Sequence, residues 1–147
     1  MVEEIKTAES LKKFFPKLSE LIKSNWQETG DRFDLDLDLN CVGGWIESGK
    51  SKAYIASIDD EVVGYALVFV TPTVWNQSKT IFTVYGLYVK PEYRGSYIAG
   101  KMLLMIEREA KRSGAFRIDF SLSKNALPFD FLSRGYEDVG VTFGKFL

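Results

Sequence analysis

The sequence has 147 residues, with 19 Lys or Arg against 20 Asp or Glu, one cysteine and no histidine. This length suits one domain with a single hydrophobic core, and the near-neutral charge gives no reason to expect a nucleic-acid partner. The lack of histidine excludes a Ser-His-Asp triad, a Cys-His pair, a histidine base and the common zinc sites, and the lone Cys41 excludes an internal disulfide.

No apolar run approaches the roughly 18 to 20 residues that span a bilayer, and the acidic start MVEEIKTAES lacks the apolar core of a signal peptide. We therefore expect a cytoplasmic protein without a membrane partner. Charge is uneven: residues 90–112 hold six basic and three acidic side chains, and residues 28–38 hold five acidic and one basic. The basic run suits a polyanionic cofactor and the acidic run suits a cationic substrate, although either run is also typical of a solvated surface.

Apolar spacing predicts the first elements of the chain. Residues 2–7 fit a short strand, and Ser10 fits the N-cap of a helix over residues 11–24. Pro16 falls inside that helix, which implies either a kink or a later start. The following segment FDLDLDLN alternates apolar and acidic residues, which taken alone predicts a strand.

Three strands are predicted next. Residues 52–58 and 62–71 have strand character, and Asp59-Asp60-Glu61 between them fits a hairpin turn, so these two strands should be antiparallel. A polar connection over residues 72–79 leads to the third strand, over residues 81–89.

The last part of the sequence alternates helices and strands. A long amphipathic helix is expected to end at Gly114, followed by a strand over residues 115–122. A short helix over residues 125–134, interrupted near Pro128, and a last strand over residues 139–147 complete the prediction.

The long helix opens in the loop RGSYIAGK, residues 94–101. The first N–H groups of a helix have no intrahelical partner, so this helix mouth suits an anion. Gly95, Gly100 and Lys101 match the Walker A pattern, but Met102 stands where a Ser or Thr should hold Mg²⁺. A P-loop NTPase also needs a parallel sheet, which the predicted hairpin contradicts, so this is the weaker interpretation.

The same loop resembles [RQ]-x-x-G-x-[GA], the acetyl-CoA pyrophosphate loop of the GNAT superfamily of N-acetyltransferases, with Tyr97 where that family usually has Gly. A second segment, NALPFDFLSRGY over residues 125–136, resembles the family stretch N-x-x-A-x-x-F-Y-x-x-x-G-[FY]. Phe131 stands there in place of the usual Tyr, and Asn125 comes one residue late. The order of predicted elements is similar to that of the family along nearly the whole chain.

The resemblance implies one α/β (α+β) domain over residues 1–147, with a central mixed, mostly antiparallel sheet flanked by helices and with strands that splay at the acetyl-CoA site. It also implies a second helix after the first, so we expect a short helix over residues 37–48 and a loop for the acidic residues before it. The implied activity is direct transfer of an acetyl group from acetyl-CoA to a primary amine of a small molecule or protein, without a metal.

Acetyl-CoA is implied to bind along the exposed strand edge and the loop. The N–H of Leu87 or Val89 would stabilise the oxyanion, and Arg94 would lie at the start of the loop. The implied cofactor-binding residues are Leu87, Tyr88, Val89, Arg94, Gly95, Ser96, Tyr97, Ile98, Ala99, Gly100, Lys101, Asn125 and Phe131.

A general base in this family often lies at the positions of Thr83 or Tyr85, which we expect to share a face of the strand with Leu87 and Val89. A phenol with a pKa near 10 is a poor base, so a water chain or a carboxylate from the acidic loop stays open as an alternative to Tyr85.

The general acid is a second open question, because the ring of Phe131 cannot donate a proton. Either the thiolate leaves unaided, which a thiol pKa near 8.5 allows, or Tyr88, Tyr136 or Ser133 takes the role. The rival hypothesis is a degenerate GNAT domain that serves as a CoA-binding or protein-interaction module.

The acceptor is expected to bind at the acidic segment, beside two tryptophans, Trp26 and Trp45. The carboxylates assigned to it are Asp31, Asp34, Asp36 and Asp38. The sequence leaves open which amine is the acceptor and whether the chain forms a homodimer.

Overall fold

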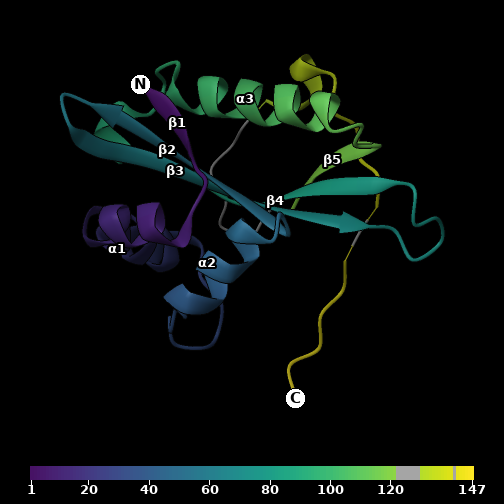
Figure 1. Ribbon diagram of the computed structural model, residues 1–147, viewed down its shortest axis with the longest axis horizontal. Coiled ribbons are helices and arrows are strands. Elements are labelled where there is room, and N and C mark those ends of the chain that lie inside the picture. The colour runs from purple at the N-terminus through teal and green to yellow at the C-terminus, as the bar shows by residue number, and fades with distance from the viewer. Residues whose placement is uncertain (122–129, 141) are drawn as a thin grey trace.

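The computed structural model describes residues 1–121, 130–140 and 142–147 (Figure 1). Its strands are β1 (Val2–Ile5), β2 (Ser51–Ile58), β3 (Glu61–Pro72), β4 (Thr80–Val89) and β5 (Arg117–Phe120). Its helices are α1 (Ala8–Thr29), α2 (Leu39–Glu47) and α3 (Ile98–Arg112), with 3₁₀ turns η1 (Pro91–Tyr93) and η2 (Leu132–Arg134).

The described strands form one sheet in the order β1-β2-β3-β4-β5. Neighbouring strands from β1 to β4 are antiparallel, and β5 is parallel to β4. At the β2–β3 turn Asp59 and Asp60 adopt positive φ angles of 47° and 63°, as the commonest tight hairpin requires. The mixed, mostly antiparallel α/β sheet and this hairpin are therefore confirmed.

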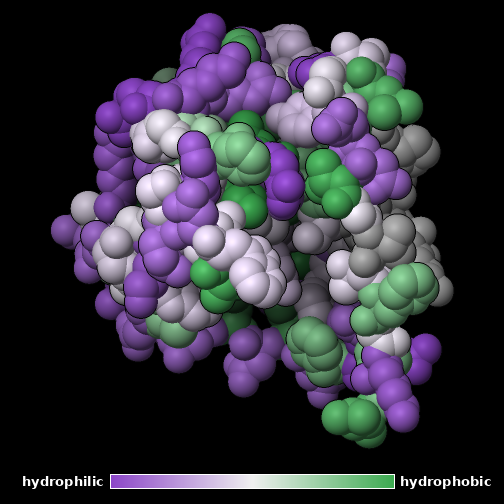
Figure 2. Space-filling view, turned by 90° about the vertical axis from the view of Figure 1, so that its right-hand side faces the viewer, coloured by the Kyte–Doolittle hydropathy of each residue, from purple (hydrophilic) through white to green (hydrophobic). Residues whose placement is uncertain are grey.

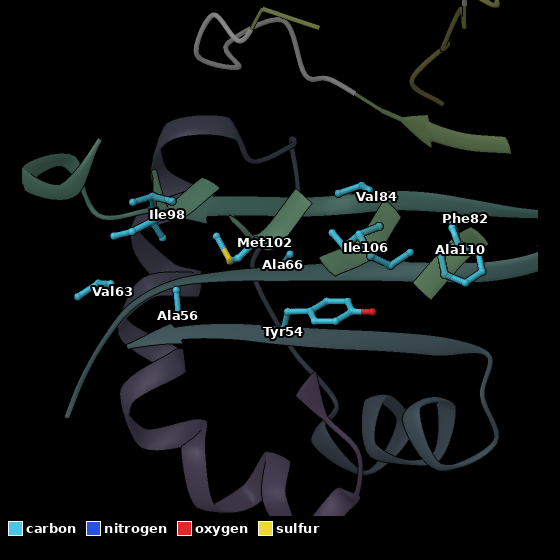
Figure 3. Close-up of a cluster of buried hydrophobic side chains, with 12 residues drawn as sticks. Tyr54, Ala56, Val63, Ala66, Phe82, Val84, Ile98, Met102, Ile106 and Ala110 are labelled. Atoms are coloured by element: carbon cyan, nitrogen blue, oxygen red, sulfur yellow. The ribbon is translucent and has the colours of Figure 1, made fainter. Parts of the chain in front are cut away.

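Helices cover both faces of the sheet, with α3 on one face and α1 and α2 on the other (Figure 1). We call these the α3 face and the α1–α2 face. On the α3 face, apolar side chains of α3 pack against the strands (Figure 3). This cluster comprises Tyr54, Ala56, Val63, Ala66, Val68, Phe82, Val84, Val89, Ile98, Met102, Ile106 and Ala110. The cluster on the α1–α2 face comprises Ile5, Leu11, Leu18, Leu21, Val42, Ile46, Ala53, Ile55, Val62 and Tyr88.

Helix α1 is longer than predicted at both ends. The Thr7 hydroxyl, not Ser10, caps it, because Thr7 Oγ1 accepts the Ser10 N–H at 3.0 Å and leaves Ser10 inside the helix. The helix continues through Pro16, because its side chains at Leu11, Leu18 and Leu21 are buried against the sheet. None of the helices in the described ranges has both the length and the apolar character needed to cross a membrane.

The predictions for the C-terminal part were partly wrong. The expected strand over residues 139–147 does not form in residues 139–140 and 142–147, and Phe143 is 92% exposed. A strand needs a neighbouring strand to pair with, and this segment runs away from the sheet (Figure 1). Of the helix predicted over residues 125–134, residues 125–129 lie outside the described part, and residues 132–134 form only a 3₁₀ turn.

Strand β5 spans four residues, Arg117–Phe120, fewer than the predicted 115–122. The ring of Phe116, just before it, is exposed. Figure 2 views the side of the molecule on which the β3–β4 hairpin lies, and it shows separate hydrophobic patches among hydrophilic residues. No described strand pairs with the part of β4 beyond Val84 on this side, and the candidate site lies there.

Candidate active site

Strand β4 contains a β-bulge at its centre. Leu67 of β3 pairs with Gly86 and the next residue, Val68, pairs with Val84, so Tyr85 has no partner on β3. The extra residue reverses the alternation of side chains along the strand. Val84 and Val89 both belong to the α3-face cluster, in spite of their odd spacing.

The bulge corrects one prediction about the base. Thr83 pairs with Phe69, whose ring packs edge-on against Trp45 of α2 at 5.4 Å. Thr83 therefore lies on the α1–α2 face, opposite to Leu87 and Val89. The Tyr85 ring also contacts Phe69, at 5.5 Å, and it is 69% exposed.

Beyond the bulge no described strand pairs with the outer edge of β4, and we call this part of the strand its open edge. Pairing with β5 ends at Val84 and Phe120, but β4 continues to Val89. The Lys90 N–H donates to Val63 O of β3 at 2.9 Å. Because N–H groups alternate in direction along a strand, those of Leu87 and Val89 point away from β3, toward this open edge. An extended ligand rich in amides can pair with such an edge.

The mouth of helix α3 adjoins this edge. Gly95 precedes it with a φ of +76°, a conformation that favours glycine. The first N–H bonded within the helix is that of Lys101, to Tyr97 O at 2.9 Å. The N–H groups of Ala99 and Gly100 make no hydrogen bond to the described residues. A guanidinium nitrogen of Arg134 lies 3.1 Å from the point where a Gly100 Cβ would stand. The mouth thus combines open donors, the positive end of a helix and a cation, which suits an anion.

Arg94 connects this loop with helix α1. Its Nη2 lies 2.8 and 2.9 Å from the two carboxylate oxygens of Glu28, and its Nε donates to Val89 O at 2.8 Å. The guanidinium also lies 5.2 Å from the centre of the Tyr88 ring. Arg94 thereby holds the end of α1 beside the open edge of β4. Sequence reasoning missed Glu28 as its partner, although Glu28 begins the acidic run.

One cleft of about 920 Å³ joins these parts. It is lined by the open edge of β4, the loop before α3, the C-terminal half of α1 and the segment around η2. Predicted cofactor residues that line it are Leu87, Tyr88, Val89, Arg94, Gly95, Ser96, Tyr97, Ala99, Gly100 and Phe131. The Ile98 side chain is instead buried in the α3-face cluster, and Lys101 is exposed with its Nζ 4.2 Å from the Tyr97 ring centre. Asn125 lies outside the described residues.

The residue at the family's usual Tyr position packs among aromatic rings. The Phe131 ring lies 4.6 Å from that of Phe120 and 5.7 Å from that of Tyr136. The Tyr136 hydroxyl donates to Glu107 at 2.9 Å, and burial, with this carboxylate, raises the Tyr136 pKa. Tyr136 and Ser133 do not line the cleft, whereas Tyr88 does. Of the alternatives considered for the acid, only Tyr88 lies in the cleft.

The residues predicted to bind the acceptor are separated in the structure. Asp31 and Trp26 line the cleft, whereas Asp34, Asp36 and Trp45 do not. Asp38 accepts the Cys41 N–H at 2.9 Å and caps helix α2, so its carboxylate has a structural role.

Tyr65 is a cleft residue that sequence reasoning missed. Its hydroxyl accepts a hydrogen bond of 2.7 Å from the Asn25 side chain, and burial raises its pKa to about 12. Tyr65 therefore stays protonated near neutral pH and can donate a hydrogen bond, but it cannot act as a base. Within the described residues, no three or more Asp, Glu or Cys side chains are grouped closely enough to hold a metal ion.

Comparison with known proteins yields one family match. The profile described as the acetyltransferase (GNAT) family matches residues 15–129. No curated protein matches the sequence.

Many solved structures share this fold. An aminoglycoside acetyltransferase from an uncultured soil metagenomic sample, in complex with sisomicin, has 17% identity and a TM-score of 0.75, over 100% of this chain and 95% of that one. A predicted acetyltransferase of Clostridium acetobutylicum with acetyl-CoA has 20% identity and a TM-score of 0.74, over 99% and 96%. A ribosomal-protein-alanine N-acetyltransferase of Brucella melitensis has 15% identity and a TM-score of 0.68, over 100% and 96%.

Proposed function

The chain belongs to the acetyltransferase (GNAT) family, and we propose that it transfers the acetyl group of acetyl-CoA to a primary amine of a small molecule or protein by direct attack. The observation that carries the proposal is the open edge of β4 beyond the Tyr85 bulge, in one cleft with the mouth of α3. These two features match the two polar parts of the cosubstrate, an amide-bearing arm and a pyrophosphate.

In this proposal the main chain does most of the binding. The outward N–H groups of Leu87 and Val89 would pair with the pantetheine amides or stabilise the oxyanion. The N–H groups of Ala99 and Gly100 would bind the pyrophosphate, with Arg134 adding positive charge. Bound acetyl-CoA supplies a thioester carbonyl, which an uncharged amine can attack.

Few side chains in the described lining of the cleft could take part in proton transfer. Two carboxylates on the α1 side line the cleft, Glu28 and Asp31. Arg94 engages Glu28 through both of its oxygens, so we assign removal of the amine proton to Asp31, directly or through water. Tyr85 is the alternative at the bulge. Tyr88 is the candidate acid, although a thiolate with a pKa near 8.5 can leave unaided.

The cofactor site can be tested with one added charge. Ala99→Asp places a carboxylate at the mouth of α3, where it repels the pyrophosphate, and should weaken acetyl-CoA binding at least tenfold, or about 1.4 kcal/mol. Titration calorimetry measures the affinity. Leu104→Asp is the matched control, because it adds the same charge at an exposed position of the same helix. Equal affinity of the two variants would show that the mouth is not the site.

Activity itself is tested by thiol release from acetyl-CoA with a panel of amines, polyamines and peptides. At least one of them should stimulate release above the rate of hydrolysis. A specific observation, Phe131 at the position of the family's usual Tyr, favours a second candidate function, a CoA-binding module with little catalysis. If acetyl-CoA binds in calorimetry and nothing in the panel stimulates thiol release, that second function replaces the first.

A further inference from the structure

We infer that the acceptor is a small monoamine with an apolar or aromatic body, bound between α1 and the sheet with its amine at Asp31. The inference rests on the proposed acetyl transfer and specifies its second substrate.

The lining of the cleft on the α1 side is mainly hydrophobic. Its apolar side chains come from α1, from the segment between α1 and α2, and from the strands beneath. They include Phe15, Leu18, Ile22, Trp26, Phe33 and Leu37. Glu28 and Asp31 are the charged residues of this part of the described lining, and both are acidic. An apolar ligand would bind such a surface most favourably, because binding removes the apolar side chains from water.

The charge available to an acceptor is close to one unit. Glu28 is compensated by Arg94 at 2.8 Å. Asp31 accepts the N–H of Arg32 at 2.8 Å through Oδ1, and among the described residues no hydrogen bond reaches its second oxygen, which could bind a ligand. Asp34 and Asp36 lie outside the lining, and Asp38 caps α2. On the α1 side a polycation would therefore find one uncompensated carboxylate and lose water from its other charges. Asp130 also lines the cleft, in the segment around η2, where its Oδ1 accepts the Ser133 N–H at 3.1 Å.

The polar side chains in this part of the cleft are largely bonded to one another. The Thr29 hydroxyl donates to the Asn25 side chain at 3.0 Å, and the Asn25 amide donates to the Tyr65 hydroxyl at 2.7 Å. A ligand with many hydroxyl groups would therefore find few free partners, and its buried hydroxyls would be left without hydrogen bonds.

An aromatic pair lies next to Asp31. The rings of Trp26 and Phe33 are 5.1 Å apart, and Phe33 is 65% exposed although both line the cleft. Exposed aromatic surface beside a carboxylate offers a face for a flat or apolar body and a charge for its amine. The acceptor expected from this geometry differs from the aminoglycoside named for the soil metagenomic structure.

The test compares acceptors at fixed acetyl-CoA in the thiol-release assay. Phenethylamine and hexylamine should have kcat/KM values at least about tenfold above those of spermidine and an aminoglycoside, the discrimination that an apolar pocket achieves. Preference for spermidine, the aminoglycoside or peptides would overturn the inference and leave acetyl transfer standing. Failure of every acceptor would instead defeat the proposed function.

Two variants locate the binding surface. Phe33→Ala should raise the KM for phenethylamine about tenfold without changing the affinity for acetyl-CoA in calorimetry. Phe143→Ala removes another exposed phenyl ring, one outside the cleft lining, and should leave both values unchanged. The same KM in the two variants would overturn the inference.

Discussion

The two faces of the sheet are built from similar side chains but are covered to different extents. On the α3 face, Met102 and Ile106 are completely buried, and the α3 residues in the described lining of the cleft are Ala99 and Gly100, in its first turn. On the α1–α2 face, core residues such as Leu11 and Leu18 also line the cleft. Helix α3 is a closely packed support, whereas helix α1 contributes side chains both to a core and to the cleft. Strand residues of the α3-face cluster, such as Ala66 and Val84, line the cleft as well.

This contrast predicts unequal costs for the same truncation. Ile106→Ala should lower the free energy of unfolding by about 3 kcal/mol, because the closed α3 face cannot collapse around the hole. Ile22→Ala should cost only about 1 kcal/mol, because that half-buried side chain already borders the cleft. Urea denaturation measures both. Equal losses would mean that the two faces are packed alike.

A smaller effect concerns the ion pair that holds α1 against the edge of β4. Glu28→Gln removes the charge that engages Arg94 at 2.8 Å and should cost about 1 to 2 kcal/mol, since the pair is partly buried. It should also weaken acetyl-CoA binding in calorimetry. Glu20→Gln on the same helix is the control, because the exposed Glu20 carboxylate pairs with the exposed Lys23 at 3.3 Å, and the substitution should change neither quantity. Similar behaviour of the two variants would remove the structural role given to Arg94.

The smallest expected effect is a pH dependence of the free energy of unfolding, and it comes from a residue of helix α3. Hydrogen bonds from Arg112 and Lys52 lower the pKa of Glu109 from 4.5 to about 2. The carboxylate therefore contributes stability that is fully present above pH 4.5 and is lost as the pH falls toward 2, about 1 kcal/mol after screening by solvent. Urea denaturation at pH 6 and pH 3 should show a smaller acid loss for Glu109→Gln than for the natural protein, and equal losses would contradict this assignment.

Local rules were enough to predict most of the fold. The hairpin at Asp59 and Asp60 and the strands beside it follow from turn chemistry and alternation, and the confirmed sheet contains them. The bulge at Tyr85 could not be predicted, because the side chains around it are mostly apolar and either face would accept them. The strand predicted over residues 139–147 was wrong for a different reason: residues 139–140 and 142–147 pair with no described strand, and the local sequence does not indicate whether a segment finds a partner strand.

The part of the candidate site that is formed by residues close together in the sequence could be predicted. The mouth of α3 follows from a loop of eight residues, 94–101, and the structure brings it beside the open edge of β4. The contact between Glu28 and Arg94 joins residues 66 positions apart, and no local pattern indicates it. Asp38 was grouped with the acceptor residues because charge alone cannot separate a helix cap from a binding carboxylate.

The open edge of β4 also bears on how the protein can change. Its outward N–H groups are main-chain atoms, so many substitutions of the side chains at residues 86–89 would leave them in place as long as the layers still pack. The opposite wall of the cleft presents side chains such as Trp26, Phe33 and Asp31, and each substitution there alters the surface an acceptor meets. Substitutions can therefore change the preferred acceptor while acetyl-CoA binding is retained. We expect acceptor specificity to change faster in evolution than the acetyl-transfer reaction itself.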